Sequence, residues 1–194
     1  MKFSLLTSAI LAISSATSVL SAPSGDVAAS LKKRQNSTAN VFPEPDGTSK
    51  LGVQTWKAPS WHFPATGPWS HVSKYGGLLY IAGQRGYDAD TDKLVETNVA
   101  PGVNNTLPGY TRIKKAYEDM LSIAAAAGAT PQDCVRTVIY TTDMFRFRPT
   151  ANAVTIELWG NGTDAVYPVR TIIEVSRLNE DDIIEVEGTF AVPQ

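Results

Sequence analysis

The pattern of apolar and polar positions between residues 69 and 192 predicts alternating strands and helices. Residues 69–84 are typical of a β-hairpin with its turn at 75–77, because β-branched and aromatic residues flank two adjacent glycines. Residues 109–130 carry apolar side chains at helical spacing, and Gly128 and Pro131 mark the end of that helix. The predicted buried stripe of the helix consists of Ile113, Ala116, Tyr117, Met120, Leu121, Ala124 and Ala127.

Strand and helix patterns continue to the end of the chain. Residues 134–143 predict a strand and residues 148–160 a shorter helix. Residues 166–178 and 183–192 predict two further strands joined by a polar turn. The order β-β-α-β-α-β-β over residues 67–194 favours a single α+β domain, with one mixed β-sheet and both helices on one face.

Alternation along the last two strands separates charged from apolar side chains. On the final strand, Glu185 and Glu187 lie on the face opposite to the apolar residues. On the preceding strand, Arg170 shares a face with Ile172 and Glu174. If the helices cover the apolar faces, Arg170 is expected on the uncovered face, together with Glu185. Such a half-apolar, half-charged face predicts a subunit interface with clefts.

The first 66 residues have the composition of targeting, processing and linking segments. Residues 1–22 combine a basic start, an apolar core too short for a membrane anchor, and small residues, which predicts a signal peptide. Residues 23–34 end in a Lys-Lys-Arg run, typical of a pro-segment cut at a dibasic site, although such a run can also be a solvated charge cluster. Residues 35–66 predict an extended N-terminal arm, partly ordered by its aromatic residues Trp56, Trp61 and Phe63. The chain is therefore expected to be secreted and free of any membrane anchor; N-terminal sequencing that starts elsewhere than Gln35 would contradict the processing.

Charge and cysteine content narrow the class of partner. Residues 35–194 keep 13 of the 17 Lys and Arg and 18 of the 19 Asp and Glu, a net charge of −5, which gives no general attraction for nucleic acid. Cys134 is the only cysteine, so an intrachain disulfide is impossible, and its apolar surroundings predict a buried thiol. The sequons at Asn36, Asn104 and Asn161 lie in loop-like sequence and are candidate glycosylation sites.

Arg170 stands inside an apolar strand pattern and is the strongest candidate for ligand binding. An arginine held on a rigid strand can grip a planar carboxylate with two hydrogen bonds. The alternative is an ion pair with Glu174 or Glu185 within the sheet. His62 and His71 have no cysteine or carboxylate partner at metal-ligand spacing, so no metal site is expected.

Resemblance to a known family rests on three segments: LLYIAGQRGYDADTDKLV, AYEDMLSIAAAAGATPQDCVRTVIYTTD and YPVRTIIEVSRLNEDDIIEVEGTFAV. Together they resemble the Rid family of reactive-intermediate enamine and imine deaminases, also called YjgF-like, in a secreted, fungal-type form. The resemblance covers roughly residues 67–192, and its P-x-R and E-V-E segments are the most specific. It implies a chorismate-mutase-like fold and a homotrimer with three clefts between subunits.

The resemblance also implies roles for individual residues. Arg170 matches the arginine that binds the substrate carboxylate, and Glu185 matches a glutamate that positions or activates water. Gly83 matches a glycine that lines the pocket, and Asn152 matches an asparagine on the second helix. The implied reaction is hydrolysis of a carboxylate-bearing enamine or imine to a keto compound and ammonia, without a metal or an organic cofactor.

Three departures from the family pattern concern the pocket wall. Active members usually carry serine, tyrosine and cysteine at the positions of Ala82, Trp69 and Ile172. These changes make the pocket larger at one wall and more apolar. An alternative function is a non-catalytic, or differently catalytic, binder of a small carboxylated metabolite in the same clefts. An endoribonuclease, a label often attached to the family, is disfavoured by the negative charge and the lack of a histidine pair.

Overall fold

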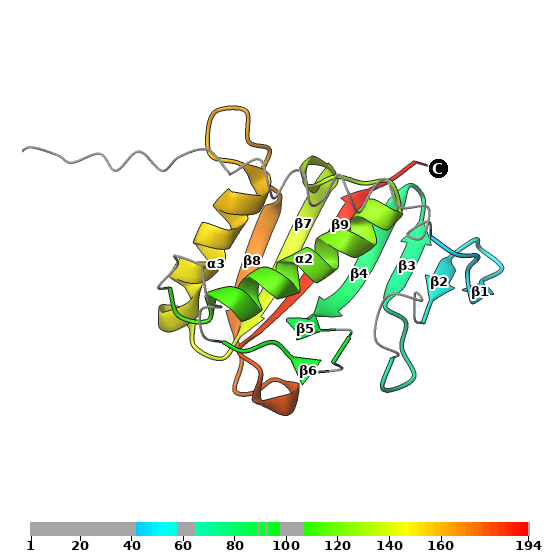
Figure 1. Ribbon diagram of the computed structural model, residues 1–194. Helices are drawn as coiled ribbons and strands as arrows, with labels where there is room; N and C mark the ends of the chain where they lie inside the picture. Colours follow the sequence, from blue (N-terminus) through cyan, green and yellow to red (C-terminus); the bar gives the residue numbers. More distant parts are fainter. Residues whose placement is uncertain (1–41, 58–64, 89, 92, 98–106, 194) are drawn as a thin grey trace, which may run out of the picture.

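The computed structural model describes residues 42–57, 65–88, 90–91, 93–97 and 107–193, which form a mixed sheet with two helices on one face (Figure 1). The strand order is β1 (Gly47–Thr48), β2 (Gln54–Trp56), β3 (Val72–Tyr75), β4 (Leu78–Gln84), β9 (Ile184–Ala191), β7 (Cys134–Thr141) and β8 (Val169–Glu174). Neighbouring strands are antiparallel except β7 and β8, which are parallel. Helices α2 (Tyr110–Ala126) and α3 (Met144–Trp159) cover the sheet, and β5 (Tyr87–Asp88) pairs with β6 (Lys93–Leu94) in a separate hairpin below β4. The predicted α+β class is confirmed.

Several predicted features lie outside the described residues. These are the signal peptide at 1–22, the pro-segment at 23–34, the sequons at Asn36 and Asn104, and the aromatic residues Trp61 and Phe63. Asn161 is described, and it is exposed just after the end of α3. No helix within the described part of the chain combines the length and apolarity needed to cross a bilayer.

Two elements form where the sequence pattern predicted them. The hairpin is β3 and β4. Its turn glycines Gly76 and Gly77 have φ of 59° and 77°, values that residues with a Cβ rarely adopt. The apolar stripe of α2 is buried except at its last residue, which is half-buried. Gly188 of β9 lies so close to this helix that a Cβ there would be 2.6 Å from Sδ of Met120. The close approach fixes α2 above the centre of the sheet.

Helix α3 begins at Met144 rather than at the predicted Arg148. Asp143 caps the helix, because its side chain accepts a 3.0 Å hydrogen bond from the backbone N–H of Arg146. Pro149 lies inside the helix. The predicted end at Gly160 is correct, and there φ is 99°.

The N-terminal arm adds two strands that the sequence pattern did not predict. Strand β2 pairs with β3, and β1 pairs with β2, so the arm extends the sheet beyond the hairpin. Trp56 anchors it in the core, with its ring edge-on to Phe42 at 4.9 Å and its Nε1 donating to the carbonyl of Pro43 at 2.9 Å. Strands this short offer no alternation to recognise in the sequence.

A buried carboxyl on α2 predicts how stability depends on pH. Burial raises the pKa of Asp119 to about 6, although the ion pair with Lys115 acts in the opposite direction. The folded state therefore keeps this proton at pH values where the unfolded chain, with its ordinary value of 3.8, has lost it. Stability from this group is highest in acid and decreases as pH rises through the interval between these two values. We expect Asp119→Asn to flatten the dependence of Tm on pH there, measured by thermal denaturation, while the exposed Asp164→Asn leaves it unchanged.

Candidate functional site

Arg170 lies on β8, the edge strand of the sheet, and its side chain is on the face covered by the helices. The strand register pairs Arg170 with Thr137 of β7, and Thr137 with Gly188 of β9, which faces Met120 of α2. The expectation that Arg170 lies on the uncovered face with Glu185 is therefore wrong, because Glu185 alternates with residues that face the helices. Strand β8 carries apolar residues on both faces, so alternation alone did not indicate which face the helices cover.

The charge of Arg170 is not buried. Its side chain is exposed, and none of the ion pairs among the described residues involves it. The alternative pairing with Glu174 or Glu185 is therefore absent from the described part of the chain. Glu174 instead accepts a 2.7 Å hydrogen bond from the backbone N–H of Met144, at the start of α3. No carboxylate among the described residues therefore neutralises the guanidinium, which can bind an anionic ligand.

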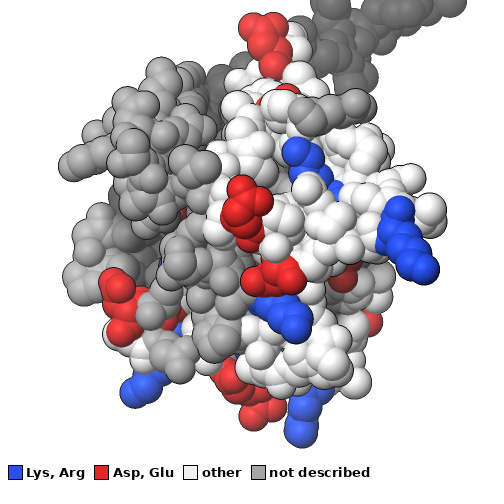
Figure 2. All heavy atoms as spheres, turned by 90° about the vertical axis from the view of Figure 1, so that its right-hand side faces the viewer, with Lys and Arg blue, Asp and Glu red and all other residues white. Residues whose placement is uncertain are grey.

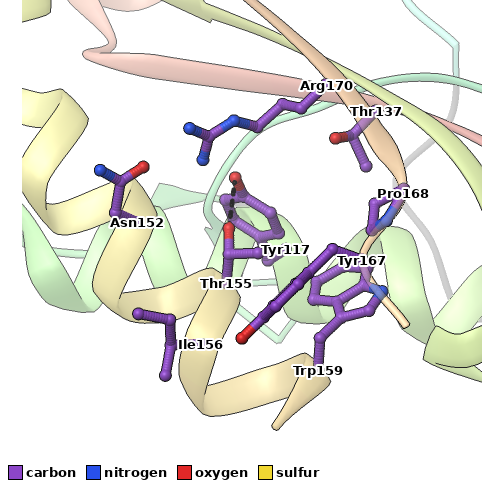
Figure 3. Close-up of a pocket in the computed structure, with 9 residues that line it drawn as sticks. All are labelled: Tyr117, Thr137, Asn152, Thr155, Ile156, Trp159, Tyr167, Pro168 and Arg170. Atoms are coloured by element: carbon purple, nitrogen blue, oxygen red, sulfur yellow. Dashed lines mark hydrogen bonds between the residues drawn. The ribbon is translucent and has the colours of Figure 1, made fainter. Parts of the chain in front are cut away.

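A cavity of about 340 Å³ separates α3 from β8, and Arg170 lines it (Figure 3). Figure 3 shows the guanidinium reaching from the strand toward the side-chain amide of Asn152 on α3. The other polar lining residues are Thr137 and Thr155. The remaining wall is apolar or aromatic and consists of Tyr117, Ile156, Trp159, Tyr167 and Pro168. The cavity thus combines a few convergent polar groups with an apolar wall, as small-molecule sites usually do.

Two hydroxyl groups lie at the floor of this cavity. The Thr155 hydroxyl is 3.3 Å from that of Tyr117 and 2.8 Å from the backbone carbonyl of Ala151. Burial raises the pKa of Tyr117, although the Thr155 hydroxyl and Arg170 partly oppose the shift. Tyr117 therefore keeps its proton at neutral pH and can act as a hydrogen-bond donor.

Glu185 belongs to a second group of candidate residues, on the uncovered face of the sheet. Its carboxylate folds over Gly83 so closely that a Cβ at residue 83 would lie 2.5 Å from the carboxyl carbon. Next to Gly83, the backbone N–H of Ala82 donates to the carbonyl of His71, and Trp69 packs edge-on against the His71 ring at 4.6 Å. The predicted residues Glu185, Gly83, Ala82 and Trp69 are thus close together, but they lie apart from Arg170.

Burial and nearby charged groups shift the pKa of the Glu185 carboxyl. Half-burial raises its pKa, Arg85 opposes the increase, and Glu187 and Asp182 add to it. Arg85 is itself held by a 2.9 Å hydrogen bond to the backbone carbonyl of Asn179. A carboxylate with a raised pKa is a stronger base than that of an ordinary glutamate, which suits a general base.

The Gly83 contact predicts a specific substitution effect. We expect Gly83→Ala to displace the Glu185 carboxylate and to lower the rate of any reaction that uses this carboxylate by about 10- to 100-fold, with an unchanged fold, because the obstacle is the end of a flexible side chain. A double-mutant cycle measures the coupling between residues 83 and 185, and it compares the rates of Gly83→Ala, Glu185→Gln and the double variant. The double variant should be no slower than Glu185→Gln, whereas additive losses would show that the two residues act independently.

Most of the cavity wall was not predicted from the sequence. Asn152, Thr155, Ile156 and Trp159 have the spacing i, i+3, i+4, i+7, so one face of α3 points into the cavity. That spacing was a signal in the sequence, but Tyr167 depends on how the chain folds back toward β8. Ile172, predicted to touch the substrate, packs against the hydrophobic core instead and is not among the cavity-lining residues.

Comparison with known proteins gives a family and a set of relatives. The family model described as "Endoribonuclease L-PSP" matches residues 60–192. A RutC family protein of Pyrococcus abyssi is 31% identical over 140 residues, which is 72% of this chain and 95% of that protein. A protein of Salmonella typhimurium named 2-iminobutanoate/2-iminopropanoate deaminase is 29% identical over 136 residues, 70% of this chain and 93% of that protein.

Solved structures are similar over the same part of the chain. A protein of Rhodopseudomonas palustris, described as a "probable translation initiation inhibitor", superposes with a TM-score of 0.62 and 32% identity. The match covers 74% of this chain and all of that one. The descriptions of these relatives thus differ, whereas the fold and the matched region agree.

Proposed function

Because the chain belongs to the endoribonuclease L-PSP family, also called the Rid family, we propose that it hydrolyses a carboxylate-bearing enamine or imine to a keto compound and ammonia. The observation that carries the proposal is the exposed guanidinium of Arg170, which belongs to none of the ion pairs among the described residues and is directed into a cavity with the Asn152 amide. A planar carboxylate fits such a guanidinium with two parallel hydrogen bonds. The substrate would thereby be fixed at one end, with its reacting carbon free.

In this proposal, Glu185 activates the water molecule that attacks the substrate. Its carboxylate takes a proton from water while the water oxygen bonds to the carbon of the C=N group. Glu185 passes this proton to the nitrogen, which gives a carbinolamine. The carbinolamine hydroxyl then loses its proton to Glu185 as the C=O bond forms, the C–N bond breaks, and the nitrogen takes that proton from Glu185 and leaves as ammonia. Glu185 therefore ends the cycle unchanged.

The opposite-face positions of Arg170 and Glu185 require a second chain in this proposal. Strand β8 is an edge, and it exposes Val169 and Ile173 on the face that the helices leave uncovered. An unprotected apolar edge strand favours association with another copy. In a homotrimer with head-to-tail contacts, Arg170 of one subunit would meet Glu185 of its neighbour across each interface.

A coupled assay tests the proposed activity. An amino-acid oxidase generates the imino acid, and keto-acid release is followed with and without the protein. We expect faster release with the wild-type chain and with Arg148→Ala, an exposed arginine on α3 outside the cavity. Equal rates with and without protein would exclude deamination of the tested imines.

A second candidate function is a binder of carboxylated metabolites without hydrolysis. It is favoured by the cavity within one chain, which holds Arg170 and Asn152 but has no carboxylate among its lining residues. Ligand-detected NMR separates the two candidates. A carboxylate that binds the wild type but not Arg170→Ala, with no acceleration of imine hydrolysis, would favour the binder.

RNA cleavage fits the described residues less well, despite the description of the family. His71 is fully buried, so it cannot reach a polynucleotide without rearrangement. On the side of β1–β3 shown in Figure 2, lysine and arginine side chains are spread singly among acidic ones. A nucleic-acid footprint is typically a continuous basic stripe.

A further inference from the structure

The Arg170 cavity is divided into a polar end and an apolar end. The guanidinium of Arg170 and the amide of Asn152 lie together, while the rings of Tyr167 and Trp159 lie at the opposite end (Figure 3). Ile156 closes the side along α3. A carboxylate on Arg170 therefore directs the rest of a bound molecule toward the aromatic rings.

The aromatic wall is preorganised. The Tyr167 hydroxyl donates a 2.6 Å hydrogen bond to the backbone carbonyl of Gly160, which fixes the ring beside the cavity. Trp159 is 2% exposed and packs edge-on against Tyr117, with ring centroids 6.0 Å apart. Rings held in this way bind an apolar group without a large loss of side-chain entropy.

Size and exposure point to a ligand with a large apolar group. A cavity of about 340 Å³ lies at the lower end of the range that holds drug-sized molecules. A substrate of three or four carbons would leave much of the cavity filled with water that contacts the apolar walls. Ile156 and Tyr167 remain 40% and 46% exposed, and an apolar ligand group would cover both.

We propose that the cleft is specific for 2-imino or 2-keto carboxylates with an aromatic or large aliphatic side chain. The carboxylate binds Arg170, and the apolar group packs among Trp159, Tyr167 and Ile156. The hydrolytic part of this assignment rests on the proposed deaminase function. The ligand preference rests on the cavity alone.

Binding of two stable keto acids, pyruvate and phenylpyruvate, tests the preference by calorimetry on the full-length protein. We expect phenylpyruvate to bind wild type at least about tenfold more tightly, since even one methylene in an apolar pocket is worth roughly 10-fold or more. Thr155→Phe fills the cavity and should abolish the advantage, whereas Thr155→Val, of nearly the same size, should keep it. Ile156→Asn, at an exposed position, should reduce the advantage even if Thr155→Phe does not fold.

Two results would overturn the preference: equal affinity of the wild type for both acids, or phenylpyruvate binding that survives Arg170→Ala. Imines made from alanine and from phenylalanine are assayed in parallel. If neither is hydrolysed faster with the protein, the deaminase function fails, while the calorimetric ratio still decides the ligand class. If both imines are hydrolysed faster but phenylpyruvate binds no more tightly than pyruvate, the deaminase function is supported and the proposed ligand preference is refuted.

Discussion

Arg170→Ala is expected to lower kcat/KM for imino-acid hydrolysis by about 10²- to 10³-fold, the equivalent of losing two charge-assisted hydrogen bonds to the substrate carboxylate. The loss should appear mainly in KM if the guanidinium grips substrate and transition state equally. Arg170→Lys keeps the charge but not the planar fork, so it should recover only part of the rate. Steady-state kinetics over a range of imino-acid concentrations measure both parameters.

The stability of Arg170→Ala separates a binding role from a structural one. Arg170 is exposed and belongs to none of the ion pairs among the described residues, so its removal should leave Tm nearly unchanged. Arg148→Ala is the matched control and should keep full activity. A marked decrease in Tm for Arg170→Ala alone would show that the residue stabilises the fold.

Glu185→Gln is expected to reduce kcat by about 10²- to 10⁴-fold, because the amide cannot accept a proton from water. Its KM should change little, because the substrate carboxylate is bound by Arg170 and not by Glu185. Burial raises the pKa of Glu185, so the wild-type rate should decrease as the pH falls through this raised pKa. The rate of the Glu185→Gln variant should not show this decrease. Single-turnover rates between pH 4 and 8 are the measurement.

The same shift predicts that Glu185→Gln does not destabilise the protein at neutral pH. A carboxyl whose pKa is raised by folding favours its protonated form, so its contribution to stability decreases as pH rises through the folded value. The neutral amide resembles that protonated form. A loss of activity together with a normal Tm would therefore indicate a role in chemistry, whereas unfolding of the variant would remove this interpretation.

Long periodic segments made most of the fold predictable from the sequence. The stripe of α2 and the alternation of β9 each repeat several times, so their buried faces were identified correctly. Strands β1 and β2 have too few residues to show a period. The start of α3 was misplaced because Asp143, which caps the helix, was assigned to the end of the preceding strand.

The candidate site was predictable as a set of residues but not as an arrangement. Arg170, Glu185, Gly83 and Asn152 were named from motifs, and Gly83 does lie so close to Glu185 that a Cβ at residue 83 would displace the carboxylate. The face of Arg170 could not be deduced, because it depends on the register between β7 and β8. The aromatic cavity joins α2, α3 and the segment before β8, which no local pattern connects.

Mixing two inactive chains tests whether Arg170 of one subunit and Glu185 of another complete each cleft. Arg170→Ala and Glu185→Gln chains are unfolded together, refolded and assayed for imine hydrolysis. With random assembly into a head-to-tail ring, about one quarter of the clefts receive both intact residues. If the clefts form in this way, activity should be near one quarter of wild type in the mixture and almost absent in either variant alone. A mixture that assembles but stays inactive would show that the two residues do not complete a cleft between subunits.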